Sequence, residues 1–215
     1  MLREVTSNEI FTILIMVGLI CITIAKIAYT IRFNDFSAIL ANSKYLNIYS
    51  REQRFLDKFD ALLFSNFIIS IAIFISICYK VLLADVKLDP DIILKFILGI
   101  SVFLIIKALF ERLIASLFNI DDVIDNYIFQ KTSYKNFFGM LLIPVNAILI
   151  YSITPSKTIL YVVLSVLLVL LTISLSTSLK RYQKLIKSNL FYFILYLCTL
   201  EIAPYVILYK FVTVN

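Results

Sequence analysis

The sequence predicts an all-α protein, a polytopic membrane helix bundle with six transmembrane helices plus one or two interfacial amphipathic helices. Of its 215 residues 61% are hydrophobic, which is well above the roughly half-apolar composition of soluble domains. The apolar residues form runs long enough to cross a bilayer, which takes about 20 residues of helix. No Pro-rich or Gly/Ser-rich linker separates these runs, so we expect a single integral membrane domain over residues 1–215.

Six apolar runs define the expected transmembrane helices. The first run is longer than the roughly 7–15-residue core of a signal peptide, and no small-residue cleavage site follows it, so we interpret it as a retained helix. The fifth run is nearly pure Leu, Val, Ile and Ser, which favours contact with lipid. The six runs cover about residues 10–31, 61–84, 92–118, 137–153, 158–179 and 190–212.

Two polar intervals keep their apolar residues near helical spacing. Residues 32–60 are expected to lie along the membrane surface, with Arg51, Arg54 and Lys58 toward the headgroups. Residues 119–132 are acidic and amphipathic. We therefore expect both intervals to form interfacial helices outside the membrane-crossing runs.

The distribution of basic residues predicts the orientation. Most of the 20 lysines and arginines fall in the intervals after the first, third and fifth runs. The positive-inside bias places these intervals in the cytoplasm and both termini outside it. We assign the net charge of +6 to topology and to anionic lipid, and we expect no nucleic-acid partner.

The last run carries one carboxylate, Glu201, three residues before Pro204. A carboxyl group within a transmembrane helix is costly against lipid tails, so Glu201 is expected to face protein or water. Pro204 lacks an N–H and displaces a backbone carbonyl, so it is expected to kink the helix beside the acid. Pro144 predicts a second kink in the fourth run.

A buried polar cluster is expected around the charged residues of the third run. Lys107 and Glu111 are one turn apart and can pair. Counting about 1.5 Å per residue along the helices places Lys107 close enough in membrane depth for its side chain to approach Glu201. Arg112 and Lys26 are expected to complete the cluster, although Lys26 can also extend to the interface. Such a cluster can be an ion or proton path, an anionic-lipid headgroup pocket, or a salt bridge that fixes helix registry.

Two asparagines are expected to form polar contacts between helices. Asn66 has Ser70 one turn later, and this pair can hydrogen-bond across helices. Asn146 lies two residues after Pro144, and together they mark a polar interior in the fourth run.

An acidic motif, Asp-Asp-x-x-Asp, is formed by Asp121, Asp122 and Asp125. Carboxylates one turn apart can hold Mg²⁺ against a diphosphate, so the motif is a weak metal-site candidate. Such a site needs a second acidic cluster, for which Asp57 with Asp60 is the one candidate. Alternatively, these acids begin a helix, where the helix dipole favours negative charge.

No cofactor, metal centre or catalytic residue is otherwise predicted. Cys21, Cys78 and Cys198 are far apart in apolar runs, and the chain contains no histidine. Nucleotide-binding loops and catalytic serine motifs are absent from the sequence. The cysteines are therefore interpreted as buried small hydrophobic residues.

Two stretches resemble one known family. Their residues are Phe193-Ile-Leu-Tyr-Leu-Cys-Thr-Leu-Glu-Ile-Ala-Pro204 with Leu208-Tyr-Lys210, and Tyr127-Ile-Phe129 with Asn136-Phe-Phe-Gly-Met-Leu-Leu-Ile-Pro144 and Tyr151. They are similar to the signature of an uncharacterised integral membrane family of Bacteroidota, domain-of-unknown-function family 4271. The resemblance implies a multi-pass protein of the inner membrane of a Gram-negative cell, and it implies no activity.

Three function classes are compatible with these observations. Short loops and structural polar features favour a non-catalytic subunit or assembly factor of an inner-membrane protein complex. The Glu201 cluster and the two prolines favour a small transporter or lipid-headgroup-handling protein with an anionic or polyprenyl lipid as partner. The acidic motif leaves a membrane enzyme acting on a lipid-linked phosphate as a third class.

Overall fold

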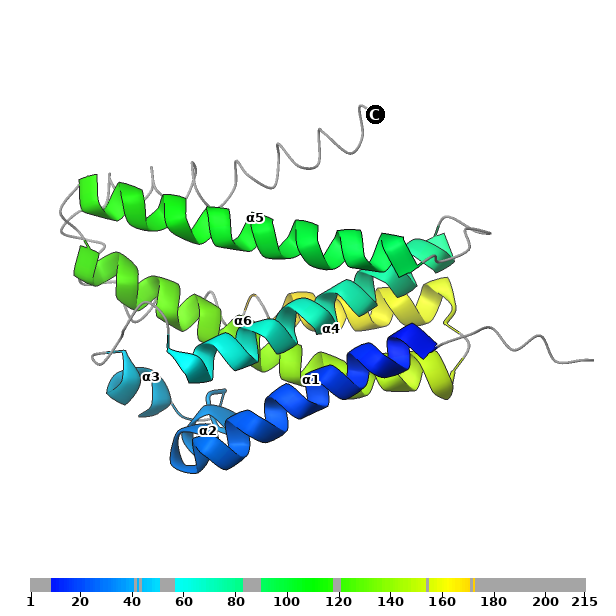
Figure 1. Cartoon of the computed structure of the whole chain (residues 1–215), viewed down its shortest axis with the longest axis horizontal. Coiled ribbons are helices and arrows are strands. Elements are labelled where there is room, and N and C mark those ends of the chain that lie inside the picture. Colours follow the sequence, from blue (N-terminus) through cyan, green and yellow to red (C-terminus); the bar gives the residue numbers. More distant parts are fainter. Residues whose placement is uncertain are drawn as a thin grey trace, which may run out of the picture.

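The computed structural model describes residues 9–40, 42, 44–50, 57–82, 90–117, 121–153, 155–170 and 172. Over these ranges the fold is entirely helical and contains no strand. The helices are α1 (Glu9–Ala28), α2 (Thr30–Ser37), α3 (Lys44–Tyr49), α4 (Lys58–Leu82), α5 (Pro90–Leu117) and α6 (Asp121–Tyr151), followed by a Lys157–Leu170 helix (Figure 1).

Four helices are long and apolar enough to cross a membrane, namely α1, α4, α5 and α6. They correspond to the first four expected runs, so the all-helical membrane architecture is confirmed at this coarser level. The described part of the fifth run is the Lys157–Leu170 helix, and the sixth run lies outside the described residues. The count of six transmembrane helices therefore stays a prediction.

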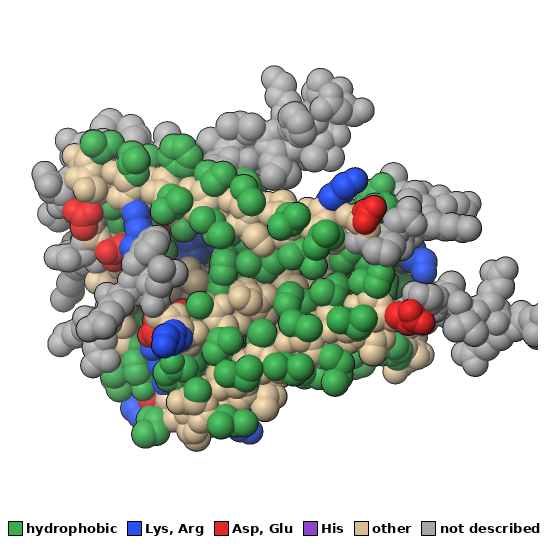
Figure 2. Space-filling view, in the orientation of Figure 1, with side chains coloured by type: hydrophobic (Ala, Val, Ile, Leu, Met, Phe, Trp, Pro, Cys, Tyr) green, Lys and Arg blue, Asp and Glu red, His purple; other side chains and the backbone are tan. Residues whose placement is uncertain are grey.

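Charged side chains gather at the two ends of the bundle, and an apolar band lies between them (Figure 2). Large aliphatic side chains are exposed along this band, including Leu98, Val102 and Ile106 of α5. Water would disfavour so large an exposed apolar surface, whereas lipid tails accept it. The protein is therefore embedded in a membrane.

Helix α4 lies at the centre of the bundle and packs against α6, α1 and α5, most extensively against α6. Its apolar stretch is 56% buried, compared with 11% for α5, which lies at the outside. The close approach of α4 and α6 depends on Gly139, because a Cβ atom there would lie 2.5 Å from the Cα of Phe67. Membrane helices use small residues in this way to bring their backbones together.

Residues 121–151 form one continuous helix, which corrects the prediction of a surface helix over 119–132 and a separate transmembrane helix from 137. The sequence has no Gly or Pro between Asp121 and Phe138 that would interrupt the backbone hydrogen bonds. The beginning of the helix also has buried apolar contacts, since Ile124 and Tyr127 pack with Ala115 of α5. The start of α6 thus stands beside α5 and extends the bundle.

Helices α2 and α3 lie where a single amphipathic segment was expected after the first run. Their aromatic residues are buried against the ends of the long helices. Phe36 packs edge-on against Tyr45 and Phe59, with ring centroids 5.4 Å and 5.8 Å apart. This aromatic cluster attaches α2 and α3 to the end of the bundle where α1 ends and α4 begins (Figure 1). Arg51 and Arg54 lie outside the described residues.

Candidate functional site

A buried carboxylate, Glu111, lies between two lysines from different helices. Its Oε1 atom accepts a hydrogen bond from the Nζ of Lys131 at 2.7 Å, and the Nζ of Lys107 lies 3.9 Å away. The side chains of Glu111 and Lys107 are 2% and 4% exposed, and that of Lys131 is 12% exposed. Removing one partner would leave a buried charge uncompensated, so the residues of this group depend on one another across the contact of α5 with α6.

The antiparallel arrangement of α5 and α6 explains this meeting. Lys107 lies ten residues before the end of α5 at Leu117, and Lys131 lies ten residues after the start of α6 at Asp121. At about 1.5 Å per residue the two positions reach the same depth from the junction of the helices. Closer to that junction, the Nε of Arg112 pairs with the Oδ1 of Asp125 at 3.1 Å, again joining α5 to α6.

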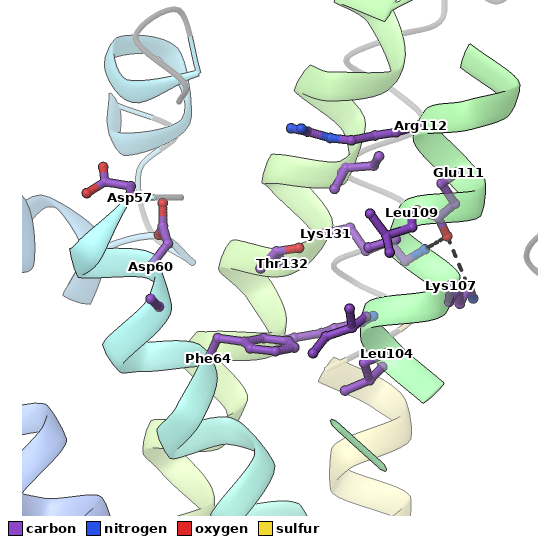
Figure 3. A pocket seen from close by; sticks show the side chains of 15 residues that line it. Asp57, Asp60, Phe64, Leu104, Lys107, Leu109, Glu111, Arg112, Lys131 and Thr132 are labelled. Atoms are coloured by element: carbon purple, nitrogen blue, oxygen red, sulfur yellow. Dashed lines mark hydrogen bonds and ion pairs between the residues drawn. The ribbon is translucent and has the colours of Figure 1, made fainter. Parts of the chain in front are cut away.

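A cavity of about 340 Å³ lies between α4, α5 and α6 (Figure 3). Basic side chains of α5 and α6 line one side of it, and the acidic residues just before and within the first turn of α4 line another. In Figure 3, Asp57 and Arg112 lie toward one end of the cavity, whereas Phe64 and Leu104 lie toward the other. Its charged lining residues are Asp57, Asp60, Lys107, Glu111, Arg112, Lys131 and Lys135.

The cavity has its mouth at the outer surface of the bundle. Ile105 and Leu109 of α5 both line it, yet each is 49% exposed. Because α5 is the least buried of the long helices described, this side of the cavity lies toward the outside of the bundle.

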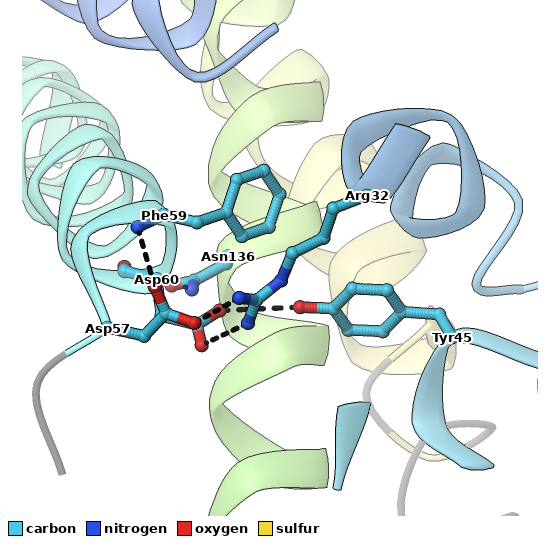
Figure 4. Close-up of polar contacts among 6 residues, drawn as sticks. All are labelled: Arg32, Tyr45, Asp57, Phe59, Asp60 and Asn136. Atoms are coloured by element: carbon cyan, nitrogen blue, oxygen red, sulfur yellow. Dashed lines mark hydrogen bonds and ion pairs between the residues drawn. The ribbon is translucent and has the colours of Figure 1, made fainter. Parts of the chain in front are cut away.

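Arg32 of α2 binds the two carboxylates at the start of α4 (Figure 4). Its Nη1 pairs with the Oδ2 of Asp57, and its Nη2 donates to the Oδ2 of Asp60 at 2.9 Å. The guanidinium also lies over the rings of Phe59 and Tyr49, at 4.7 Å and 4.9 Å from their centroids. Hydrogen bonds and cation–π contacts together fix α2 against α4.

The environment keeps both Arg32 and Tyr45 in their protonated forms. Burial by itself would lower the pKa of Arg32, but the carboxylates of Asp60 and Asp57 hold that pKa above its ordinary value. Burial raises the pKa of Tyr45 above that of an ordinary phenol. The Tyr45 hydroxyl therefore remains a donor to the Oδ1 of Asp60, at 3.4 Å.

The expected cluster is thus assembled in part by different residues. Lys107, Glu111 and Arg112 line the cavity, while Lys26 is exposed in the last turn of α1 and does not. The reason is that α1 packs mainly against α4, which places Lys26 away from α5. Glu201 lies outside the described residues, as does Pro204.

The predicted polar residues of the core lie between α4, α6 and α1. Asn146 is fully buried, and its Nδ2 donates to the backbone carbonyl of Ser70 at 2.8 Å. Asn66 is also fully buried, and its Oδ1 would lie 3.0 Å from a Cβ atom placed on Gly18. Pro144 lies inside α6, and the helix continues past it to Tyr151.

The acidic motif lies at the start of α6. Asp121 is exposed, Asp125 pairs with Arg112, and the side chain of Asp122 is outside the description. In the part of the chain that the structure describes, no three metal-binding side chains lie together. The proposed second cluster of Asp57 with Asp60 is instead bound by Arg32.

Sequence reasoning missed the roles of Arg32, Lys131 and Lys135 in this region. Lys131 falls in the interval expected to form an interfacial helix, and Lys135 falls between that interval and the fourth run. The equal ten-residue spacing of Lys107 and Lys131 from the α5–α6 junction becomes visible only once the bounds of both helices are known. For the pairing of Arg32 with Asp57 and Asp60, we find no comparable signal in the sequence.

The chain was compared with protein families, curated proteins and solved structures. A family described as "Domain of unknown function (DUF4271)" matches residues 11–212. No curated protein and no solved structure matches the chain.

Proposed function

We propose that this membrane protein, which belongs to the DUF4271 family, binds the phosphate headgroup of an amphiphile in the cavity between α4, α5 and α6. The observation that carries the proposal is that one cavity, open toward the outside of the bundle, combines two kinds of lining. Basic side chains of α5 and α6 form what we call its basic wall, and apolar side chains lie beside them.

Charge supports a phosphate as the recognised group. Lys107, Arg112, Lys131 and Lys135 all line the cavity from α5 and α6. Counting Glu111 and Asp125, the described residues of this wall still carry two more positive than negative charges. Charge-assisted hydrogen bonds from lysine and arginine to phosphate are short and strong, and they gain strength away from bulk water.

Size and polarity support an amphiphile. The volume of about 340 Å³ is at the small end of the roughly 300–1,000 Å³ range of ligand pockets, so it suits a headgroup with the first methylene groups of its tails. Phe64, Leu104 and Ala108 supply apolar surface beside the charged residues. The rest of each tail would extend past Ile105 and Leu109 into the bilayer.

Lipid binding can be measured by native mass spectrometry of the purified protein in detergent. We expect retention of a phospholipid such as phosphatidylglycerol, and no retention of diacylglycerol, which has the same tails without phosphate. Arg112→Gln and Lys135→Gln should each weaken phospholipid binding about tenfold, the effect of losing one charge-assisted hydrogen bond. Lys95→Gln, an exposed residue at the other end of α5, is the matched control and should bind as the natural protein does.

Two results would overturn the proposal. Equal retention of diacylglycerol and phospholipid would show that the basic wall does not recognise phosphate. Inorganic phosphate that competes as strongly as the phospholipid would identify a soluble anion as the ligand.

The role of a complex subunit or assembly factor remains a prediction. The transporter and membrane-enzyme classes remain predictions as well. The same mass spectra address the first of these, since a subunit would retain stoichiometric protein partners after gentle extraction.

A further inference from the structure

The two sides of the cavity differ in charge, and from this we infer the class of headgroup. Resting on the proposed function above, we propose that the ligand is a zwitterionic phospholipid whose phosphate lies against α5 and α6 and whose primary ammonium group binds Asp57 and Asp60. Among the described lining residues, basic side chains outnumber acidic ones on the α5–α6 side, whereas the α4 side carries two carboxylates that line the same cavity.

Arg32 neutralises these carboxylates only in part. One guanidinium binds both Asp57 and Asp60, so the group of three residues has a net charge of −1. The carboxylate side chains remain 33% and 23% exposed, so a ligand in the cavity can reach them. A cation held there adds the missing positive charge, and the headgroup spans the gap between oppositely charged walls.

The oxygen of each carboxylate that does not bind Arg32 retains acceptor capacity. The Oδ1 of Asp57 accepts from the backbone N–H of Phe59 at 3.3 Å, and the Oδ1 of Asp60 accepts from Tyr45 at 3.4 Å. Both contacts are longer than the usual 2.7–3.2 Å, and each carboxylate oxygen has two lone pairs. A primary ammonium is a compact charge with three donors, which suits two neighbouring acceptors of this kind.

A quaternary ammonium fits this place poorly. It has no N–H to donate, and proteins usually bind such groups within cages of aromatic rings. The nearby rings of Phe59 and Tyr49 already lie against the guanidinium of Arg32. The chemistry of the α4 side therefore favours ethanolamine-type over choline-type headgroups, and the carboxylates disfavour purely anionic ones.

The order of groups along the cavity matches the order within such a lipid. Phe64 and Leu104 lie at one end, and Asp57 and Arg112 lie at the other (Figure 3). Asp57 comes just before α4, at the end of the bundle near α2 and α3 (Figure 1). Tails, phosphate and ammonium would thus lie in sequence from the apolar end to the start of α4.

The test compares four lipids with identical tails on the purified protein in detergent, again by native mass spectrometry. They are phosphatidylethanolamine, its N,N-dimethyl form, phosphatidylcholine and phosphatidylglycerol. We expect affinity to fall as N–H groups are lost, with phosphatidylethanolamine about tenfold above phosphatidylcholine and above phosphatidylglycerol. Equal affinity for all four would overturn the zwitterion inference and leave phosphate binding intact, whereas failure of all four to bind better than diacylglycerol would overturn both.

Asp57→Asn provides a second measurement, because the amide keeps an acceptor oxygen and removes the charge. We expect the preference for phosphatidylethanolamine over phosphatidylcholine to fall to about one while overall phospholipid retention persists. Asp91→Asn, an exposed residue at the start of α5, is the matched control and should keep the preference. A full preference in folded Asp57→Asn protein would overturn the inference. If that variant does not fold, the lipid series on the natural protein decides alone.

Discussion

Lys131 of α6 donates a hydrogen bond of 2.7 Å to Glu111 of α5, twenty positions earlier in the chain. Both side chains are largely buried. This pair joins the two helices within the bundle at the level of the cavity. Lys107 lies on the other side of the carboxylate at 3.9 Å. A single acidic residue therefore organises two of the basic side chains proposed to face a phosphate.

Lys131→Met is expected to destabilise the protein by about 3–5 kcal/mol, because it leaves the carboxylate of Glu111 buried with a weaker partner. The double variant Glu111→Gln with Lys131→Met removes the uncompensated charge and should recover much of this loss. Thermal unfolding in detergent measures both. A double variant no more stable than Lys131→Met would contradict the electrostatic explanation.

Gly139→Ala should destabilise the bundle by about 1–3 kcal/mol or more, because the new methyl group would meet the backbone of Phe67. Gly99→Ala is the matched control, since a Cβ atom there has no neighbour within 4 Å. That control should be neutral or more stable by up to about 1 kcal/mol, the helix propensity difference between the two residues. Equal melting temperatures for the two variants would refute the close contact of α4 with α6.

Arg32→Lys should loosen α2 and α3 from the end of α4. Lysine keeps the charge, but it cannot reach two carboxylates with a planar fork while also stacking on aromatic rings. Hydrogen exchange over α2 and α3 should become faster while that of the α4 interior is unchanged. Lys44→Gln removes an exposed ion pair with Asp35 and is the control, and it should change this exchange little. Unchanged exchange in Arg32→Lys would show that the aromatic cluster alone holds these helices.

The helical architecture was predictable because long apolar runs dominate the sequence, and the lysine–glutamate pair of α5 follows from one-turn spacing. The extent of α6 was not predictable from hydropathy. Lys131 and Lys135 lower the apolar character of its first half, yet that half packs beside α5 through Ile124 and Tyr127. Polar residues that face a cavity within the bundle look, in sequence, like residues of a surface helix.

The contact of Arg32 with Asp57 and Asp60 was unpredictable for a different reason. It depends on how α2 folds back across the end of the bundle, which aromatic packing of Phe36, Tyr45 and Phe59 determines. Such packing depends on three-dimensional shape and leaves no periodic pattern along the chain. The acidic motif of α6 is the opposite case, because it is a clear pattern in the sequence. It suggested a metal site, whereas in the structure Asp125 pairs with Arg112.

Orientation in the membrane gives the last prediction. In the structure, α1 ends and α6 begins at one end of the bundle (Figure 1). Helix α6 ends at the opposite end, and Ser156 comes five residues later in the chain. The positive-inside bias assigns the first end to the cytoplasm. In a background with the three natural cysteines replaced, Ser156→Cys should react with a membrane-impermeant maleimide applied to the non-cytoplasmic side of the membrane. Asn42→Cys, exposed near the first end, should react only after the membrane is permeabilised. The reverse pattern would invert the orientation, and it would place the charged wall of the cavity nearer the outer leaflet.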